Sequence, residues 1–115
     1  MWTMNRTVNK LELNIEELRK LCSERKFKWT THILMRLQQR EINPSDVKNC
    51  IMSGEIIEQY PQDHPHPSCL ILGLCVNGQP LHTVIGCGAG YLWLITAYRP
   101  NPNEWESDLK TRKGR

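Results

Sequence analysis

A histidine and two arginines, His32, Arg36 and Arg40, are spaced four residues apart in the segment THILMRLQQR. In a helix of 3.6 residues per turn, this spacing places the three side chains in one cationic stripe. Apolar residues fall on the opposite side and are expected to pack on a core: Ile33, Leu34 and Leu37. The stripe is therefore either a solvated helix face or an anion-binding site.

The start of this helix favours the second of these readings. Thr31 is the expected N-cap, which places His32 in the first turn, at the positive end of the helix dipole. Lys28 precedes the helix and Arg36 follows one turn later, so amides, dipole and cations all favour a phosphate. The same field disfavours imidazolium, and a neutral His32 can accept a proton. The alternative is that His32 only caps or packs the helix.

A second histidine, His82, lies in the strand-like segment LHTVIG, where alternation places His82 and Val84 on one face. Thr96 and Tyr98 share a face of the next strand-like segment, which is expected to lie beside the first. A tyrosine with a threonine two residues earlier can supply a hydroxyl, a ring that stacks on a base, or both. The alternative is that all of them are ordinary strand residues.

Other chemistry-bearing patterns are weak. The loop DHPHPSC contains His64, His66 and Cys69, but these three candidate ligands have no clear fourth, so we expect no metal and no cofactor. The five cysteines are an odd number without C-x-x-C spacing and are expected to be free thiols. The sequence contains no readable Ser-His-Asp arrangement, glycine-rich phosphate loop or paired-carboxylate motif.

Three helices are expected before residue 54. Asn14, with Glu17 three residues later, caps a helix over about 14–25, and the helix with the cationic stripe ends at 41–43. Asn43 and Pro44 begin a third helix, after which Gly54 is expected in a left-handed C-terminal conformation.

After Gly54, the spacing of the apolar residues changes from the period of a helix to that of a strand. Four short apolar runs are separated by turn residues: EIIEQY, CLILGLCV, PLHTVIGC and YLWLITAY. Asn77-Gly78 is a strong hairpin signal, so the four runs predict an antiparallel meander with the helices on one face. Asn103 and Glu106 predict a short terminal helix carrying Trp105 and Leu109, followed by a frayed basic end. The expected class is α+β.

Length and charge restrict the function further. A chain of 115 residues fits one domain, and its longest apolar run is too short to span a membrane. The start has no secretory signal pattern, so a cytoplasmic protein is expected.

Residues 19–40 contain seven Lys or Arg against one acid, while residues 41–98 are mildly acidic. Such a basic block is typical of a local anion-binding face or of a solvated helix surface.

These residues together resemble a known family. The pattern H-x-x-x-R-x-x-x-R-x-I, followed by G-E-I-I, a histidine on a middle strand and I-T-x-Y-x-P with a later Trp, is matched at the following positions: His32, Arg36, Arg40, Ile42, Gly54, Glu55, His82, Thr96, Tyr98, Pro100 and Trp105. This is similar to a small prokaryotic family of unknown function, grouped with RelE-like and BrnT-like toxins of the barnase, colicin and RelE-like ribonuclease superfamily. The resemblance implies a RelE-like domain over residues 28–105, an N-terminal helix extension over 1–27 and a basic tail over 106–115.

The resemblance also implies a toxin of a type II toxin–antitoxin system that cleaves RNA without a metal, with RNA and a small antitoxin protein as partners. For that reaction His32 and His82 would be the acid and base, and Tyr98 would orient or stack a base. Arg36, Arg40, Lys28 and Thr96 would bind phosphate. The alternative is a non-catalytic module of the same fold that binds RNA or protein. Convergence of His32 and His82 on one cleft would favour the enzyme, and their separation would favour the binding module.

Overall fold

The computed structural model describes residues 12–114. This part of the chain contains three helices and five strands in the order α1 (Ile15–Ser23), β1 (Phe27–Lys28), α2 (Thr31–Gln39), α3 (Pro44–Ser53), β2 (Glu55–Tyr60), β3 (Ser68–Leu74), β4 (Pro80–Gly88) and β5 (Tyr91–Tyr98). The prediction of an α+β protein is confirmed.

Polar caps fix where the helices begin. The Asn14 side chain accepts hydrogen bonds from the first-turn amides of α1, as predicted. Helix α3 begins after Asn43, whose N–H donates to the Asp46 carboxylate. Helix α2 begins one residue earlier than predicted, because the Thr30 hydroxyl, and not that of Thr31, accepts the N–H of Ile33 at 3.0 Å. His32 still lies in the first turn.

The sheet has the strand order β1-β5-β4-β3-β2. The four predicted strands form an antiparallel meander, so this part of the topology is confirmed. The prediction of a purely antiparallel sheet of four strands is wrong, because β1 adds a fifth strand parallel to β5. Two residues are too few for an alternation pattern. Strand β1 forms because Phe27 and Lys28 pair with the edge of β5, next to a hydrogen bond from Leu92 N–H to the Lys26 carbonyl.

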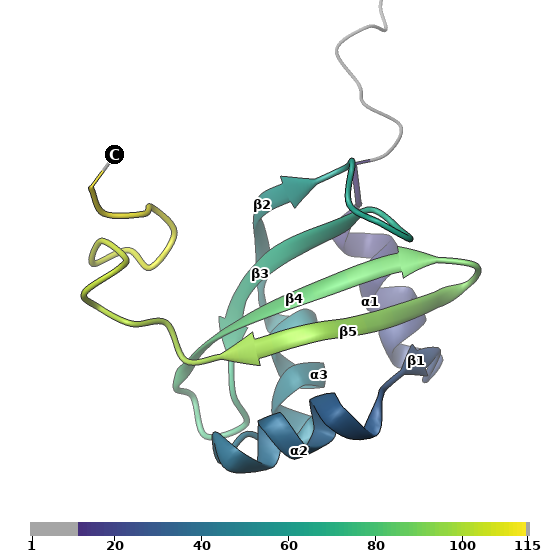
Figure 1. Cartoon of the computed structure of the whole chain (residues 1–115), viewed down its shortest axis with the longest axis horizontal. Coiled ribbons are helices and arrows are strands. Elements are labelled where there is room, and N and C mark those ends of the chain that lie inside the picture. Colours follow the sequence, from purple (N-terminus) through teal and green to yellow (C-terminus); the bar gives the residue numbers. More distant parts are fainter. Residues whose placement is uncertain (1–11, 115) are drawn as a thin grey trace, which may run out of the picture.

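All three helices pack on one face of the sheet, and that interface is the core (Figure 1). Leu18 of α1, Leu37 of α2 and Ile51 of α3 are buried there against strand residues such as Ile71 and Leu92. The predicted packing of α2 is correct for Ile33 and Leu37 but wrong for Leu34, which is 39 % exposed. A nine-residue helix laid along β5, near one side of the sheet, buries only a narrow stripe.

Gly54 does not have the predicted left-handed conformation. Its backbone is extended, with φ −99° and ψ −173°. Glycine is required there for a different reason, since a Cβ would lie 2.5 Å from the carbonyl oxygens of both Cys50 and Leu72. The residue allows α3 to turn directly into β2 against β3.

The predicted terminal helix is absent from the described residues after β5. Residues 101–114 form successive turns, closed by an isolated bridge between Trp105 and Arg112. We call residues 100–114 the C-terminal segment. Tertiary contacts outweigh the local cap signal, because Trp105 is buried and Arg112 pairs with Glu58 of β2. The basic end is therefore held by the sheet and is not frayed as predicted.

Two simpler expectations can be compared directly with the structure. All five cysteines are free thiols, as predicted, and four of them are buried. Among residues 12–114, no helix is both long and apolar enough to cross a membrane.

Candidate functional site

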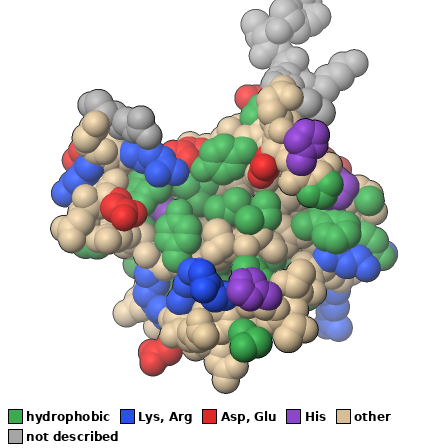
Figure 2. Space-filling model, in the orientation of Figure 1, with side chains coloured by type: hydrophobic (Ala, Val, Ile, Leu, Met, Phe, Trp, Pro, Cys, Tyr) green, Lys and Arg blue, Asp and Glu red, His purple; other side chains and the backbone are tan. Residues whose placement is uncertain are grey.

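The sheet face opposite the helices carries most of the predicted site residues, and we call it the open face. His82 lies opposite Tyr98 in the ladder, and Val84 lies opposite Thr96. Alternation predicted that the two residues of each pair share a face, and because partners in register point to the same side of a sheet, the structure places both pairs on the open face. Figure 2 looks onto this face, where hydrophobic side chains gather over the strands and Lys, Arg and His side chains line the edge above α2.

His82 is fully buried although it points away from the helices. The C-terminal segment covers it: Nε2 is 2.9 Å from the Leu109 carbonyl oxygen, and the Trp105 ring meets the imidazole edge to face at 4.5 Å. The Tyr98 ring flanks it at 5.4 Å. Burial lowers the pKa of His82, with the Leu109 carbonyl and Glu58 opposing this shift in part, so the ring is neutral near pH 7.

The tautomer of His82 follows from its partner. A carbonyl oxygen can only accept, so Nε2 carries the proton and Nδ1 has the free lone pair. Nδ1 is buried and has no hydrogen-bond partner within residues 12–114. A neutral imidazole with one nitrogen fixed and the other unpaired is chemically able to accept a proton.

The three residues of the cationic stripe differ in their surroundings. His32 and Arg36 are exposed on α2. Arg40 is partly buried, and its Nη1 donates to the Thr96 hydroxyl at 3.1 Å and to the Ala97 carbonyl at 2.9 Å. Arg40 thus joins the end of α2 to the free edge of β5. Arg40 and Thr96 were both predicted to bind phosphate, but in the structure their side chains are hydrogen-bonded to each other.

His32 and His82 are not brought together. Arg40 is the residue of α2 that reaches the end of β5 where Tyr98 and His82 lie. His32 is eight residues earlier, about 12 Å back along the helix axis. It is exposed, whereas His82 is enclosed by the C-terminal segment. By the criterion set above, this separation favours binding over catalysis by this histidine pair.

A cluster that the sequence analysis missed lies beside His82. Glu58 and Tyr60 of β2 point to the open face, and Arg112 reaches them from the C-terminal segment. The guanidinium donates to both carboxylate oxygens of Glu58 at 2.9 and 3.0 Å, and the Tyr60 hydroxyl donates to the same carboxylate. The one available signal was the i, i+2 spacing of Glu58 and Tyr60 in a predicted strand, which places both on one face.

The charges and hydrogen bonds of this cluster favour the charged forms of Glu58 and Arg112. Hydrogen bonds from Arg112 lower the pKa of Glu58. Burial and the adjacent carboxylate raise the pKa of Tyr60 to about 12. Burial also raises the pKa of Tyr98, so both phenols remain protonated and able to donate. The cluster can orient a ligand, but Glu58 is a weak base while Arg112 is bound to it.

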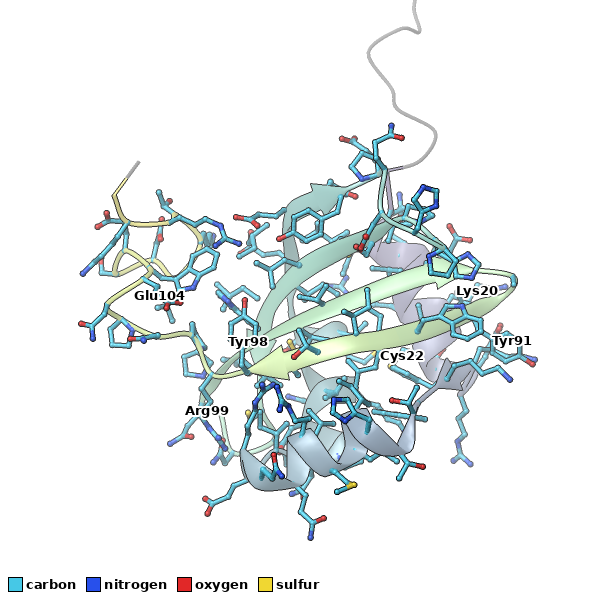
Figure 3. All side chains as sticks on the ribbon, in the orientation of Figure 1. Lys20, Cys22, Tyr91, Tyr98, Arg99 and Glu104 are labelled. Carbon is cyan, nitrogen blue, oxygen red and sulfur yellow. The ribbon has the colours of Figure 1, made fainter. Side chains whose placement is uncertain are left out.

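Lys28 lies at the other end of the open face. Its Nζ is 4.3 Å from the centre of the Tyr91 ring, and that of Lys26 is 5.8 Å from the same ring. Figure 3 places Tyr91 at the hairpin end of β5 and Tyr98 at the opposite end, beside Arg99. Lys28 is therefore distant from His82 and can serve only the hairpin end of the face.

The three candidate metal ligands diverge. Cys69 is buried in the core on the helix side, while His66 packs against Trp93 and His64 is exposed. Within residues 12–114, no group of three or more His, Cys, Asp or Glu side chains is placed to hold a metal ion.

Comparison with known proteins places the chain in a family. The model of the family described as "Domain of unknown function (DUF4258)" matches residues 29–99, more than half of the chain, and the protein belongs to this family. The match runs from just before α2 to the end of β5 and leaves out the C-terminal segment. No curated protein and no solved structure matches the chain.

Proposed function

We propose that this protein binds single-stranded RNA on the open face of its sheet. The observation that carries the proposal is an apolar, aromatic sheet face with positive side chains along its edge above α2 (Figure 2), among them the exposed Arg36. Tyr98, Tyr60 and Val84 offer surfaces for unstacked bases, and Arg36 offers a guanidinium for phosphate. Aromatic platforms with adjacent cations favour single strands, because a duplex keeps its bases stacked inside.

The resemblance to RelE-like toxins adds a biological setting to the proposal. An α+β domain with helices on one face of a meander is compatible with that group. In this setting the protein is a toxin, its target is RNA in the cytoplasm, and a small antitoxin protein is its partner. The setting is tested by expressing the chain alone and together with the product of a neighbouring small gene: growth arrest relieved by that product supports it.

RNA binding is tested with a fluorescein-labelled single-stranded oligoribonucleotide by fluorescence anisotropy. We expect Arg36→Ala to weaken binding, because its guanidinium contacts phosphate directly. The matched control is Lys20→Ala, which removes one positive charge from the exposed side of α1, on the opposite side of the sheet. Equal affinities for Arg36→Ala and wild type at low and moderate salt would contradict the proposal.

A second candidate function, metal-independent cleavage, is favoured by one specific observation. Within the described residues, His82 Nδ1 has no hydrogen-bond partner; the ring lies beside Tyr98, and its tautomer is fixed by the Leu109 carbonyl. In such a reaction Nδ1 accepts the ribose 2′-hydroxyl proton, the 2′-oxygen attacks phosphorus, the bond to the 5′-oxygen breaks, and that oxygen takes a proton from water. The products are a 2′,3′-cyclic phosphate and a 5′-hydroxyl. Access to His82 requires displacement of the Trp105 side of the C-terminal segment.

Cleavage is tested by single-turnover digestion of a defined RNA in EDTA. We expect His82→Gln, whose amide N–H can still donate to the Leu109 carbonyl, to lower the rate by about 10²-fold or more, with RNA binding retained. His32→Ala provides the comparison, because the structure separates that residue from His82. If wild-type protein binds RNA but does not cut it in EDTA, the protein is a binding module.

A further inference from the structure

The C-terminal segment contacts His82 through groups that resemble those of a nucleotide. The Trp105 ring meets the imidazole edge to face, with 4.5 Å between ring centres, as a base can. The Leu109 carbonyl oxygen lies 2.9 Å from Nε2, where a phosphate or base oxygen can also accept a hydrogen bond. Tyr98 flanks the same imidazole and is itself partly buried. The segment therefore occupies part of the surface on which the open face would bind RNA.

The core of the domain does not depend on this segment. Among the described residues, the core between the helices and the sheet ends with Ala97. The segment itself consists of turns and one isolated bridge, and it lies beside one end of the sheet, outside the layers of helices and strands (Figure 1). It also lies beyond the residues that the family model matches. Displacement of the segment would leave the helices, strands and core in place.

Arg112 holds the segment on the sheet. Its guanidinium donates two hydrogen bonds to the Glu58 carboxylate of β2 and also lies over the Trp105 ring, 4.6 Å from its centre. One side chain therefore binds both the strand and the ring that covers the imidazole. A second ion pair, between Lys110 and Glu55 at 2.9 Å, joins the segment to the start of β2. Both pairs are partly exposed to solvent, and exposed pairs stabilise weakly and are screened by salt.

The closed arrangement also has unfavourable features. Leu109 has a φ of 60°, in the left-handed region that is uncommon for a residue with a Cβ, and its carbonyl is the one that binds His82. Within residues 12–114, His82 Nδ1 has no hydrogen-bond partner while the segment covers the ring. A hollow of about 300 Å³ remains where the segment leaves the sheet, lined by Gln79, Pro80, Arg99, Pro100 and Leu109. These features lower the free energy needed to displace the segment.

We infer that the C-terminal segment is an autoinhibitory cover of the open face, which RNA displaces to reach His82 and Tyr98. This inference rests on the proposed RNA binding and adds its regulation. RNA supplies what the closed state uses or lacks, because a base can replace the Trp105 ring and a ribose hydroxyl can donate to His82 Nδ1. Since only the open fraction of the protein binds at this end of the face, a change that raises the open fraction raises the apparent affinity by the same factor.

Arg112→Gln separates this inference from simple electrostatics, because the two predict effects of opposite sign. The variant releases the segment from Glu58, but it removes a positive charge and leaves the carboxylate negative, which by charge alone would weaken RNA binding. By fluorescence anisotropy, we expect it to bind a fluorescein-labelled oligoadenylate about 5-fold more tightly than wild type, the factor that loss of an exposed ion pair can produce. The matched control is Lys113→Gln, which removes the same charge from an exposed position of the same segment. It should bind no more tightly than wild type.

Hydrogen exchange measured by mass spectrometry tests displacement in the wild-type protein. The amides of Glu106 and Lys113 donate to the carbonyls of Thr111 and Glu104 within the closed segment. Saturating oligoadenylate should make these amides exchange faster, because the displaced segment loses the sheet contacts that support its turns. A segment that stays in place would exchange at the same rate or more slowly when RNA is bound.

Two results would overturn the autoinhibitory cover alone. If Arg112→Gln binds the oligoadenylate no more tightly than Lys113→Gln, the segment does not compete with RNA. If wild-type protein binds RNA and the exchange of the segment is unchanged or slower, the segment is part of the bound structure. If neither wild type nor Arg112→Gln binds the oligoadenylate, RNA binding itself is wrong, and the inference is wrong with it.

Discussion

Arg36 and Arg40 lie one turn apart on the same side of α2, but their environments differ. Arg36 is exposed, whereas Arg40 donates two hydrogen bonds across to β5. Arg99, the residue after β5, also connects this strand to the end of α2, because it donates hydrogen bonds to the carbonyls of Arg40 and Glu41 at 2.6 and 2.9 Å. Cations commonly satisfy the unpaired carbonyls at a helix end in this way. Arg40 therefore belongs to the fold, and Arg36 remains available to a ligand.

We predict effects of different size on stability for these two arginines. Arg40→Ala should lower the free energy of unfolding by about 2 kcal/mol, because hydrogen bonds from a charged group are lost and the Ala97 carbonyl loses this donor. Arg36→Ala should change it by less than about 0.5 kcal/mol, as is usual for an exposed side chain. Urea denaturation followed by circular dichroism measures both. Equal stabilities for the two variants would contradict this division of roles.

His82 should make the protein less stable in mild acid. Its pKa is lowered in the folded state by burial, with the carbonyl of Leu109 and the charge of Glu58 opposing the shift and Arg112 adding to it. An unfolded histidine titrates at about pH 6.5. Below that pH the unfolded chain binds a proton that folded His82 does not bind, so stability falls as the pH falls through this window.

The decrease in the free energy of unfolding that His82 causes is at most about 1.4 kcal/mol per pH unit, the value for one proton. We predict that the free energy of unfolding of wild type decreases from pH 7.5 to 5.5 more steeply than that of His82→Gln. Urea denaturation at several pH values measures the difference, in which contributions from other titrating groups cancel. Parallel curves for the two proteins would show that His82 does not titrate differently on folding.

At the scale of elements, the close approach of α3 to β3 depends on two glycines. A Cβ at Gly54 would lie 2.5 Å from two carbonyl oxygens, and one at Gly73 would lie 2.1 Å from the Cys50 carbonyl oxygen. Both contacts are with backbone, which cannot rotate away as a side chain could. The spacing between α3 and the sheet is therefore set by one glycine at the end of the helix and one within β3, where a strand otherwise favours β-branched residues.

We predict that Gly54→Ala destabilises the protein by more than about 2 kcal/mol, although its φ is allowed for alanine, because α3 must move away from β3. The control is Gly86→Ala on the open face, where the nearest atoms to a new Cβ are 3.7 Å away or more. That variant should fold with nearly wild-type stability. Thermal denaturation compares the two, and a tolerated Gly54→Ala would mean that the packing of α3 adjusts easily.

The elements with a strong local pattern were predictable, and those formed by tertiary contacts were not. The caps at Asn14 and Asn43 and the four alternating strands are local signals, and the structure contains all of them. Strand β1 depends on pairing with Leu92, far along the chain. The C-terminal segment depends on Trp105 covering His82 and on Arg112 binding Glu58, so a local cap signal predicted a helix wrongly.

The same distinction applies to the candidate site. Alternation correctly placed His82, Val84, Thr96 and Tyr98 on one face, because that property follows from strand geometry. The partners of these residues come from distant parts of the chain: Arg40 on Thr96, and Leu109 on His82. Sequence spacing therefore predicted where site residues point, but not which of them are covered or already bonded.

At the scale of the whole molecule, the basic block over residues 19–40 does not form one surface. Arg19 lies on α1, behind the sheet, and donates to the carbonyls of Ile51 and Gly54 at the end of α3. Arg40 is hydrogen-bonded to Thr96 of β5. The cations left on or beside the open face are those of β1 and α2, chiefly Lys28 and Arg36. A net charge of +3 thus contributes to RNA binding through few side chains.

This distribution predicts a shallow salt dependence for RNA binding. Each phosphate neutralised on a single strand contributes about −0.7 to the slope of log K against log salt concentration, because it releases counterions. With few cations available, the slope should be small, and Arg36→Ala should reduce its magnitude by about 0.7. Tyr98→Leu should lower the affinity but leave the slope unchanged, because stacking of a base releases no counterions. Anisotropy titrations between 50 and 300 mM salt measure both quantities. A steep slope that Arg36→Ala does not change would place the phosphate contacts on another surface and remove the open face as the RNA-binding site.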